Sequence, residues 1–552
     1  MHLRLLFIVV TLFFFCNANA QLNLNVKASF NNLFRYGNGN EYSGMNKFQK
    51  EYFEEIAEGR IDVNDIIFGM RYELSEPIEY GTNFKGIKKR YIEYNNRNLG
   101  LGVRAGDFYD IFSRGLSLNV FEERSLAYDT GIDGIRLKYD KTFGKKKPVK
   151  LEAQVIGGNL NYSDFLQPDR IESYKIRNAN FRISPVRQVT IGAGYVYSKG
   201  KIPNAFDTTD ITVDLPEFNL ALNFSDFQFY AGYVWKSLRS DRSQLFPTGL
   251  STRGDGFYSA VSYSTGSFAA TLEYKNYRFD LTNPDNRSVD RPTKMLPFQN
   301  PPTAVKEHTS TLISRNPHVV NFNDEVGGQL DLLYVASDKL TFNFNTAVAS
   351  RHYRYEDIEP SVSNYQWKRV ERSFDLIPDF DKAFSPYWEI YTEAEYYATD
   401  EILTKLAFSR QSQVLFNDFF PESSETILTT TIPAEFRYRI NNEYAIKLSV
   451  EQQWQYNSIR TGDKKLMNQL ITLNLTKSPE LSFSISGEFT NDDEEPTGKK
   501  SWFIGEVLYK LNTTNSITLS YGSERGGLKC TNGICRFVNP FDGFRMSVQS
   551  IF

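Results

Sequence analysis

The sequence predicts an all-β protein, a single large antiparallel transmembrane β-barrel of about 24 strands, with a range of roughly 20 to 26. Three observations support this fold class: runs that alternate apolar and polar residues, short turns that alternate with long polar connections, and a surplus of aromatic residues. Tyr and Phe supply 33 and 44 residues against only 5 Trp. Barrels use such residues as girdles at the two membrane interfaces.

The first twenty residues have the pattern of a secretory signal peptide. His2 and Arg4 precede an apolar run at 5–15, and small residues at 18 and 20 form a cleavage site before Gln21. We therefore expect residues 1–20 to be removed and residues 21–552 to form the barrel. Lipid attachment through Cys16 is an alternative, although bulky phenylalanines stand where a lipoprotein needs small residues.

Charge and hydropathy exclude two classes of protein. Removal of Arg4 with the leader leaves a net charge of about −4, which excludes a nucleic-acid binder on charge. The mature chain has no apolar run of about eighteen residues, so an ordinary transmembrane helix is excluded as well. If the chain meets a membrane, it crosses with strands.

Short turn signals recur with strand-length runs on both sides, and mostly long polar connections lie between them. This asymmetry is typical of an outer-membrane barrel, which has short periplasmic turns and longer outer loops. A propeller would instead repeat at a nearly fixed period, and no such repeat is visible. The short turns are expected at 95–98, 144–148, 184–186, 224–226, 264–266, 337–338, 399–400, 441–442, 477–479 and 512–514.

The runs between these turns alternate with a period of two. The clearest places Tyr444, Ile446 and Leu448 on one face and Lys447 on the other, with Trp454 where an interface girdle would lie. Ten turns define twenty strands. A first strand at 22–30, a hairpin around 62–65 and the last strand bring the total to about 24.

A charge-dense stretch at 107–133 lies between two strands that have basic residues on one face. Because a membrane barrel turns charges into its lumen, we predict that this stretch folds inward. Glu122 and Glu123 are expected to pair with Arg114 or Arg124 rather than to act in catalysis. A solvated surface loop is the alternative. The predicted lumen constriction consists of Arg104, Asp107, Arg114, Glu122, Glu123, Arg124 and Arg136.

Two connections, at 280–325 and 351–386, are too long for simple hairpins. Loops of this size are usually functional or disordered. We expect both to be exposed at the surface, and inward folding as a constriction is the alternative.

The end of the chain has two further features. Cys530 and Cys535 are the only mature cysteines, and in an oxidising envelope they should pair and contribute about 2 kcal/mol. A two-thiol metal site is the alternative, but no His or further Cys lies nearby to complete it. The last strand ends at Phe552, which resembles the signal read by the barrel-assembly machinery.

Two blocks of sequence resemble a known family. They are GDFYDIFSRGLSLNVFEERSLAYDTGIDGIRLKY and RGGLKCTNGICRFVNPFDGFRMSVQSIF. Both are similar to an uncharacterised family of outer-membrane β-barrel proteins from Bacteroidota, over nearly the whole mature chain. The resemblance implies the fold and the location but no established function. More loosely, the Asp-Gly-Ile-Arg hairpin resembles those of porins and alginate-export-type channels, which transfers no binding residues.

The sequence gives little support for an enzyme. Three histidines, His308, His318 and His352, have no recognisable partners, so we expect no catalysis, no cofactor and no metal site. A transporter with an internal plug domain is disfavoured because few residues precede the first strand. The expected partners are outer-membrane lipid, the barrel-assembly machinery and possible other envelope proteins.

Two functions from different classes remain. One is a porin-like passive channel for small polar or charged solutes, with the constriction setting selectivity. The other is a plugged structural barrel that serves as a subunit of an export or envelope assembly complex. A lumen filled by residues 107–133, or a large exposed aromatic patch on the outer loops, would favour the second function.

Overall fold

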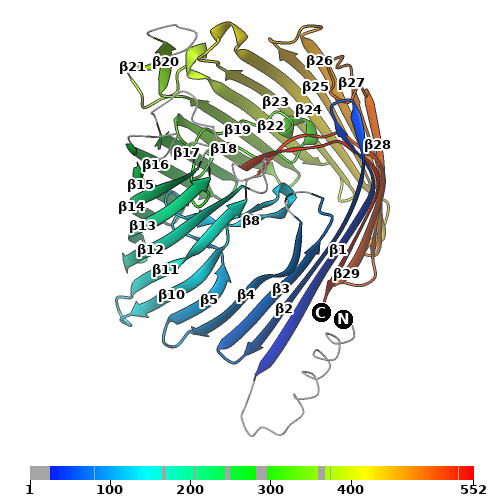
Figure 1. The fold of residues 1–552 in the computed structure, drawn as a ribbon. Helices are drawn as coiled ribbons and strands as arrows, with labels where there is room; N and C mark the ends of the chain where they lie inside the picture. Colours follow the sequence, from blue (N-terminus) through cyan, green and yellow to red (C-terminus); the bar gives the residue numbers. More distant parts are fainter. Residues whose placement is uncertain are drawn as a thin grey trace.

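The alternating runs form 24 strands of one closed sheet in the computed structural model (Figure 1). The structure describes residues 25–79, 81, 83–163, 170–203, 207–242, 249–280, 295–357, 367–372, 374–531 and 534–552. The predicted signal peptide at 1–20 lies outside the described residues. All neighbouring strands of the wall pair antiparallel, and β1 pairs with β32 to close the sheet. The prediction of an antiparallel barrel of about 24 strands is confirmed.

The wall strands follow one another around the barrel in chain order. They are β1 (Val26–Ser43), β2 (Asn46–Val63), β3 (Ile66–Ser75), β4 (Phe84–Asn96), β5 (Leu101–Phe108), β10 (Ile132–Phe143), β11 (Val149–Ser163), β12 (Ile171–Val186), β13 (Val189–Pro203), β14 (Thr208–Phe224), β15 (Phe227–Ser240), β16 (Leu250–Thr265), β17 (Phe268–Arg278), β18 (Glu325–Ser337), β19 (Leu340–Ser350), β22 (Tyr387–Tyr397), β23 (Ile402–Leu415), β24 (Glu425–Arg439), β25 (Tyr444–Asn457), β26 (Lys465–Lys477), β27 (Leu481–Thr490), β28 (Ser501–Lys510), β29 (Asn515–Glu524) and β32 (Phe541–Ile551).

Short elements in the loops complete the described structure. They are β6 (Asp110–Ile111), β7 (Asn119–Val120), β8 (Glu122–Glu123), the 3-10 turn η1 (Arg124–Leu126), β9 (Tyr128–Asp129), α2 (Thr311–Ser314), β20 (Tyr353–Asp357), β21 (Trp367–Glu371), η2 (Lys382–Phe384), η3 (Pro421–Ser423), β30 (Gly527–Thr531) and β31 (Ile534–Val538).

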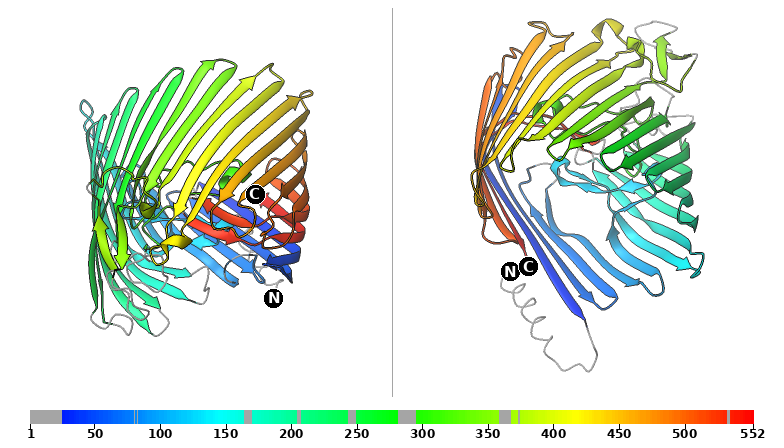
Figure 2. Two further views of the ribbon diagram at one scale, coloured as in Figure 1. Left: turned by 90° about the horizontal axis from the view of Figure 1, so that it is seen from above. Right: turned by 180° about the vertical axis from the view of Figure 1, so that it is seen from behind.

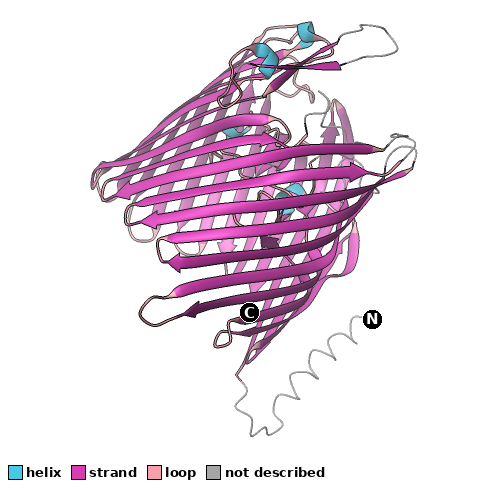
Figure 3. Cartoon of the chain, turned by 90° about the vertical axis from the view of Figure 1, so that its left-hand side faces the viewer, coloured by secondary structure: helices cyan, strands magenta, loops and turns pink. Residues whose placement is uncertain are grey.

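The two ends of the barrel differ in their connections, as the turn signals predicted. Short turns lie at the end where β1 begins and β32 ends, which we call the short-turn end (Figures 2 and 3). Long connections gather at the other end, the long-loop end. In outer-membrane barrels the short turns face the periplasm. The short turns are 64–65, 97–100, 144–148, 187–188, 225–226, 266–267, 338–339, 398–401, 440–443, 478–480 and 511–514.

The wall has apolar residues on its outer face and polar residues on much of its inner face. On β10, Ile135 and Leu137 are exposed on the outside, whereas Arg136 and Lys138 form ion pairs with Asp110 inside the barrel. An outer apolar face with paired backbone groups suits a surrounding lipid bilayer. The chain is therefore an outer-membrane β-barrel.

The first strand is longer than predicted and is placed differently. We expected a strand at 22–30, but β1 runs from Val26 to Ser43, and residues 22–24 lie outside the described part of the chain. Its polar second half stays in the wall because β1 pairs along its length with both β2 and β32. At the seam, Phe552 and Phe30 exchange backbone hydrogen bonds of 2.8 and 3.0 Å. The use of Phe552 as an assembly signal stays a prediction.

The wall is interrupted at the long-loop end between β4 and β11. The β4–β5 ladder ends at Tyr91 and the β10–β11 ladder ends at Asn159. By contrast, β4 extends to Phe84 along β3, and β11 extends to Ser163 along β12 (Figure 1). Residues 109–131 connect β5 to β10 and leave the wall here, so their side chains can enter the barrel.

Candidate functional site

Three chain segments from the long-loop end fold into the lumen and contact one another. We call them together the lumen plug. They are the insert at 109–131, the segment at 295–324, and the segment at 525–540 that contains the hairpin β30–β31. Figure 1 shows them inside the ring of strands. The predicted inward folding of the 107–133 stretch agrees with this arrangement, and its role as a constriction stays a prediction.

One face of the insert is apolar and fully buried. Phe112, Leu116, Leu118 and Val120 are at most 2% exposed. They pack on inward-facing residues of β11–β17, so this half of the barrel encloses a hydrophobic core rather than water. The wall side of the core is formed by Ile156, Leu160, Tyr174, Ile176, Val196, Ile202, Ile211, Val213, Leu215, Tyr230, Val234, Leu238, Tyr258 and Tyr277.

The segment at 295–324 completes this core and is hydrogen-bonded to the insert. The side-chain amide of Asn119 donates to the Asn300 carbonyl at 2.9 Å, and the Asn300 amide donates to the Asn119 carbonyl at 3.0 Å. The Gln299 amide donates to the Leu116 carbonyl at 3.0 Å. The two segments therefore hold each other in place through paired polar groups.

The predicted surface exposure of the long connection at 280–325 is wrong for its described part. Leu296, Phe298, Leu312 and Ile313 are fully buried. The physical reason is that Leu296 and Phe298 cover the apolar inner surface of β11–β17, and Ile313 packs on Tyr391 and Ala407 of β22 and β23, so this apolar surface does not face water. Residues 281–294 lie outside the described part of the chain.

A carboxylate on the wall fixes the short helix α2 in the lumen. Glu451 on β25 accepts hydrogen bonds from the backbone N–H groups of Thr311 at 3.0 Å and Leu312 at 2.7 Å, and from the Ser310 hydroxyl at 2.7 Å. These are orphan donors of a helix start, which an acidic group satisfies well. The plug is thus attached to the wall on the side opposite the insert's core.

The three mature histidines all lie beside carboxylates inside the barrel. A ring nitrogen of His308 lies 2.8 Å from a carboxylate oxygen of Glu389. The corresponding distance is 3.2 Å from His318 to Glu325 and 2.8 Å from His352 to Asp324. Sequence reasoning missed these partners because two of the three pairs join residues far apart in the chain. Two of the pairs connect a loop to the wall, at Glu389 of β22 and Glu325 of β18, and His352 also contacts Asn276 of β17 at 3.1 Å.

No metal centre is formed by the residues that the structure describes. Among them, no group of three or more His, Cys, Asp or Glu side chains is arranged to hold an ion. Cys530 and Cys535 form a disulfide instead, across a directly opposed position of β30 and β31. The predicted pairing of these cysteines is confirmed.

The disulfide-bonded hairpin is the third part of the plug. Ile534 packs with Leu126 and Tyr128 of the insert. Arg315, from the segment at 295–324, donates to the Gly526 carbonyl at 2.6 Å. Each of the three segments therefore contacts the other two.

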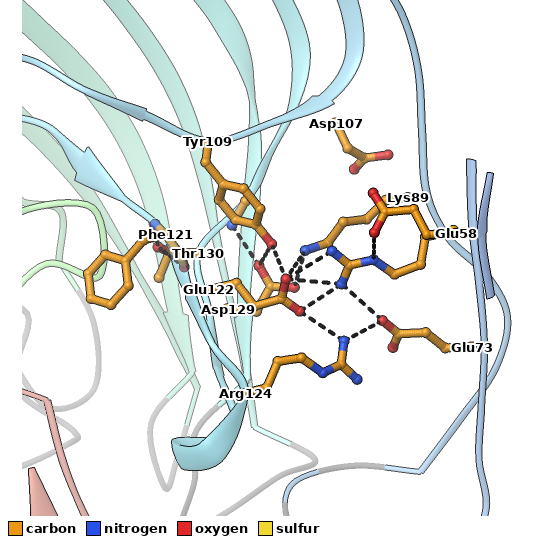
Figure 4. A network of polar contacts seen from close by, with 12 residues as sticks. Glu58, Glu73, Lys89, Asp107, Tyr109, Phe121, Glu122, Arg124, Asp129 and Thr130 are labelled. Atoms are coloured by element: carbon orange, nitrogen blue, oxygen red, sulfur yellow. Dashed lines mark hydrogen bonds and ion pairs between the residues drawn. The ribbon is translucent and has the colours of Figure 1, made fainter. Parts of the chain in front are cut away.

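The other face of the insert is charged and has Glu122 at its centre (Figure 4). The Glu122 carboxylate accepts three hydrogen bonds from the Arg71 guanidinium, at 2.8, 3.0 and 3.0 Å. Lys89 donates to the same carboxylate at 3.0 Å and Arg124 at 3.2 Å. Arg71 and Lys89 are on β3 and β4, so Glu122 joins the insert to a part of the wall outside the apolar core.

This ion-pair network keeps Glu122 ionised. Burial alone would raise the pKa of the Glu122 carboxyl, but the guanidinium of Arg71 and the ammonium of Lys89 outweigh burial and lower that pKa to about 2. Glu73 and Asp129 balance the remaining positive charge, through contacts of 3.0 Å to Arg124 and 3.3 Å to Lys89.

A second ion-pair group lies on the inner faces of β5 and β10. Arg104 contacts Glu93 at 3.1 Å, and Arg136 contacts Asp110 at 3.1 Å. Arg104 also donates to the Asp107 backbone carbonyl at 2.7 Å. Arg136 also lies 3.7 Å from Glu93, so the structure brings Arg104 and Arg136 together around this one shared carboxylate.

The side chains of the remaining predicted constriction residues have other partners. Arg114 lies over the Tyr230 ring, 5.3 Å from its centroid, and so is not the partner of Glu122. Glu123 caps η1 by accepting from the Ser125 N–H at 3.2 Å. Asp107 accepts from the Arg90 N–H at 2.7 Å. Of the two expected partners of the glutamates, Arg124 is in contact with Glu122.

Two large cavities among the described residues lie beside the plug. One of about 610 Å³ lies between the insert and β2–β5, and it is lined by charged side chains that include Arg71, Lys89 and Arg104. Another of about 470 Å³ lies between the hairpin β30–β31, the segment at 295–324 and β26–β29. Both open beside the plug rather than through the apolar core.

The outer loops expose a group of large apolar side chains, which we call the outer apolar patch. Its members are between 53% and 61% exposed and lie in the connections after β19 and after β23. Arg351 joins the two connections through contacts to Asp418 at 2.7 Å and to the Ala383 carbonyl at 2.6 Å. The patch consists of Phe374, Leu376, Ile377, Phe380 and Phe420.

The chain belongs to a family of unknown function, DUF6029, whose model matches residues 1–552. This agrees with the predicted membership in an uncharacterised barrel family. A comparison with curated proteins gives no match. No helix among the described residues is long and apolar enough to cross a membrane.

Several solved outer-membrane barrels are similar to this chain. A siderophore receptor, PirA from Pseudomonas aeruginosa, is 9% identical with a TM-score of 0.44, and the match covers 95% of this chain and 80% of that one. The copper transporter OprC is 10% identical with a TM-score of 0.43, covering 96% and 80%. An FrpB iron transporter from Neisseria meningitidis is 11% identical with a TM-score of 0.47, covering 96% and 82%. Iron, copper and siderophores are what those proteins are named for.

Proposed function

We propose that this DUF6029 chain is a plugged outer-membrane barrel that serves as a subunit of an export or envelope assembly complex. The observation that supports this most is the lumen plug, in which three loops pack together and against the wall. From the sequence, we expected that a lumen filled by the insert would favour this function over an open porin. The proposal includes no catalysis, cofactor or metal.

The plug is a stable arrangement rather than a loosely placed loop. Phe112, Leu116, Leu118 and Phe298 are at most 1% exposed, and burial of a side chain of this size is worth roughly 2 kcal/mol. Opening the plug would also separate Glu122 from Arg71. We therefore infer that the resting barrel is closed through its apolar half.

The outer apolar patch supports the second half of the proposal. Large exposed apolar patches mark sites of interaction with other proteins. These five side chains are each more than half exposed, in two connections that Arg351 joins. The patch lies on the long-loop end, which faces away from the periplasm in an outer-membrane barrel. We infer that a partner protein with an apolar surface docks there.

The passive channel remains the second candidate because of the cavity of about 610 Å³. Its lining of Arg71, Lys89 and Arg104 would select small charged solutes if the cavity connected the two ends of the barrel.

Conductance in a planar bilayer separates the two candidates. We expect refolded wild-type protein to be silent, and a variant with residues 112–130 replaced by a short Gly-Ser linker to conduct. A matched control replaces the exposed outer residues 374–380 by the same linker and should remain silent. Stable conductance of the wild-type protein would contradict the plugged barrel and favour the passive channel.

The docking role has its own experiment. Leu376, Ile377 and Phe380 are each changed to Ser, and crosslinked envelope partners are compared by mass spectrometry with those of the wild type. We expect the specific partners to disappear while the barrel remains heat-modifiable. Identical partner sets would contradict docking through the patch.

A further inference from the structure

Four basic side chains lie together on the outer face of β12 and β13, near the long-loop end. We call them the β12–β13 basic patch: Lys175, Arg177, Lys199 and Lys201. All four are exposed. The residues that alternate with them, such as Tyr174 and Val196, are fully buried in the lumen core, so the basic side chains point away from the barrel.

The patch places like charges directly opposite each other. Lys175 and Lys199 are partners in the β12–β13 register. Lys201 lies opposite Ser173 in the same ladder, and Arg177 lies opposite Tyr197. Opposed like charges in a sheet are unfavourable unless an anion lies between them. The local structure therefore favours a negatively charged ligand.

No described carboxylate neutralises the patch. None of the four side chains forms an ion pair with a residue that the structure describes, whereas other basic side chains of the outer wall do. Arg239 contacts Asp214 at 3.1 Å, and Arg278 contacts Asp255 at 2.8 Å. Asp210 lies opposite Lys201 in the β13–β14 register without forming such a pair.

The height of the patch matches a lipid headgroup layer. Exposed aromatic residues of an outer girdle lie just below it, with Tyr195 at 45% and Phe218 at 56% exposure. Lys199 lies four residues beyond Tyr195 on β13. At 3.3 Å per residue and a tilt near 45°, this places the ammonium group about 9 Å further along the membrane normal. That distance corresponds to the headgroup region rather than to the hydrocarbon core.

We propose that the β12–β13 basic patch binds the phosphorylated sugar headgroup of a glycolipid in the outer leaflet of the outer membrane. Ammonium and guanidinium groups are the donors that bind phosphate oxygens most strongly. The acyl chains of such a lipid would lie along the exposed apolar surface below the patch. This site is separate from the lumen plug, and the inference does not depend on the proposed function of the barrel.

Binding of lipid A to the purified barrel tests the proposal. The barrel is reconstituted in phosphatidylcholine nanodiscs that contain phosphorylated lipid A, and retained lipid is measured by native mass spectrometry. The test variant carries Lys175→Gln, Arg177→Gln, Lys199→Gln and Lys201→Gln. We expect its apparent affinity to fall about a hundredfold, because each basic residue near a membrane surface contributes to the attraction.

A matched control removes the same charge from the other end of the barrel. It carries Lys145→Gln, Lys146→Gln, Lys147→Gln and Lys339→Gln, which are exposed residues of short turns. This control should retain lipid A like the wild type. Equal retention by the test variant, or an equal loss in the control, would overturn the proposal.

Two further arms identify the source of the phosphate. Dephosphorylated lipid A should bind as weakly to the wild type as phosphorylated lipid A binds to the test variant. Inorganic phosphate alone should compete poorly. Strong retention of the dephosphorylated lipid, or equally strong binding of inorganic phosphate, would overturn a lipid headgroup site.

A smaller variant guards against a folding defect. Lys175→Gln with Lys199→Gln removes only the two directly opposed charges, and Lys175→Arg with Lys199→Arg keeps them. We expect the first pair to weaken lipid A binding and the second to restore it, with unchanged heat-modifiable migration in both. Equal binding by the two pairs would also overturn the proposal.

Discussion

The insert at 109–131 has two faces that contact two different regions of the barrel wall in different ways. Towards β11–β17 it buries Leu116 and Leu118 in a hydrophobic core, and towards β3 and β4 it places Glu122 between Arg71 and Lys89. The first contact excludes water, and the hydrophobic effect that stabilises it does not require a particular orientation of the side chains. The second depends on charge and on exact geometry.

This difference shows that the lumen of a large barrel need not be uniformly wet. Many inward residues of β11–β17 are apolar near the long-loop end, and they therefore require a cover. The inward residues of β2–β5 are charged and tolerate water in the cavity beside them. We expect the apolar contact to provide most of the stability of the plug and the charged contact to set its orientation.

We expect the largest loss of insert docking from a charge placed in the apolar contact. Leu118→Asp puts an unpaired carboxylate in a fully buried site and should weaken insert docking by about 4 kcal/mol. Hydrogen-exchange protection of insert amides, measured by mass spectrometry in detergent, should then fall about a thousandfold. Leu118→Met is the control and should change little. Unchanged protection in Leu118→Asp would mean that the apolar contact does not hold the insert.

The next effect concerns the charged contact. Glu122→Gln keeps the side-chain size but leaves Arg71, Lys89 and Arg124 close together without their shared anion, and should cost about 3 kcal/mol. Exchange of the insert should rise about a hundredfold, by less than in Leu118→Asp. Glu123→Gln, which affects only the cap of η1, serves as the control. If both glutamine variants behaved alike, the central role of Glu122 would be wrong.

A smaller effect is expected from the disulfide in the third plug segment. Changing Cys530 and Cys535 to Ser removes a constraint worth about 2 kcal/mol, whereas the 24 wall strands keep their ladders. The double variant should remain a heat-modifiable barrel on gel electrophoresis, with faster exchange only in β30 and β31. Complete loss of the barrel would refute this dispensability.

Mild acid should have the smallest effect of all. The pKa of Glu122 is lowered from 4.5 to about 2, so its contribution is complete above the unfolded-state value and is lost only as pH falls from about 4.5 towards 2. Insert protection, corrected for the intrinsic exchange rate, should therefore be equal at about pH 7 and about pH 5. A loss of protection near pH 6 would show that a group other than Glu122 controls the charged contact.

The wall could be predicted from sequence because its signals are local. The period of two and the short turns need only neighbouring residues, and the expected turn at 144–148 lies exactly between β10 and β11. The first strand was less clear, since the second half of β1 is polar and is kept in the wall by pairing with β2 and β32.

The site could be predicted only in part. Arg104 and Arg136 on the flanking strands predicted that the charged side chains of the insert would face inward. The pairing of Glu122 with Arg71 could not be predicted, because it joins residues 51 positions apart. Leu116, Leu118 and Val120 do alternate along the sequence. This pattern indicates a buried face, yet an apolar lumen contradicts the usual expectation for a barrel interior.

The contact between the insert and the wall can be measured directly at Ser117 and Glu217. The Ser117 hydroxyl donates to the Glu217 carboxylate on β14 at 2.5 Å, deep in the apolar half. With Cys530 and Cys535 changed to Ser, the pair Ser117→Cys and Glu217→Cys is treated in whole cells with a short, permeant bifunctional thiol reagent. We predict an efficient crosslink, mapped by mass spectrometry, and little labelling of Ser117→Cys alone by a bulky impermeant reagent. Rapid surface labelling without a crosslink would contradict the plugged barrel.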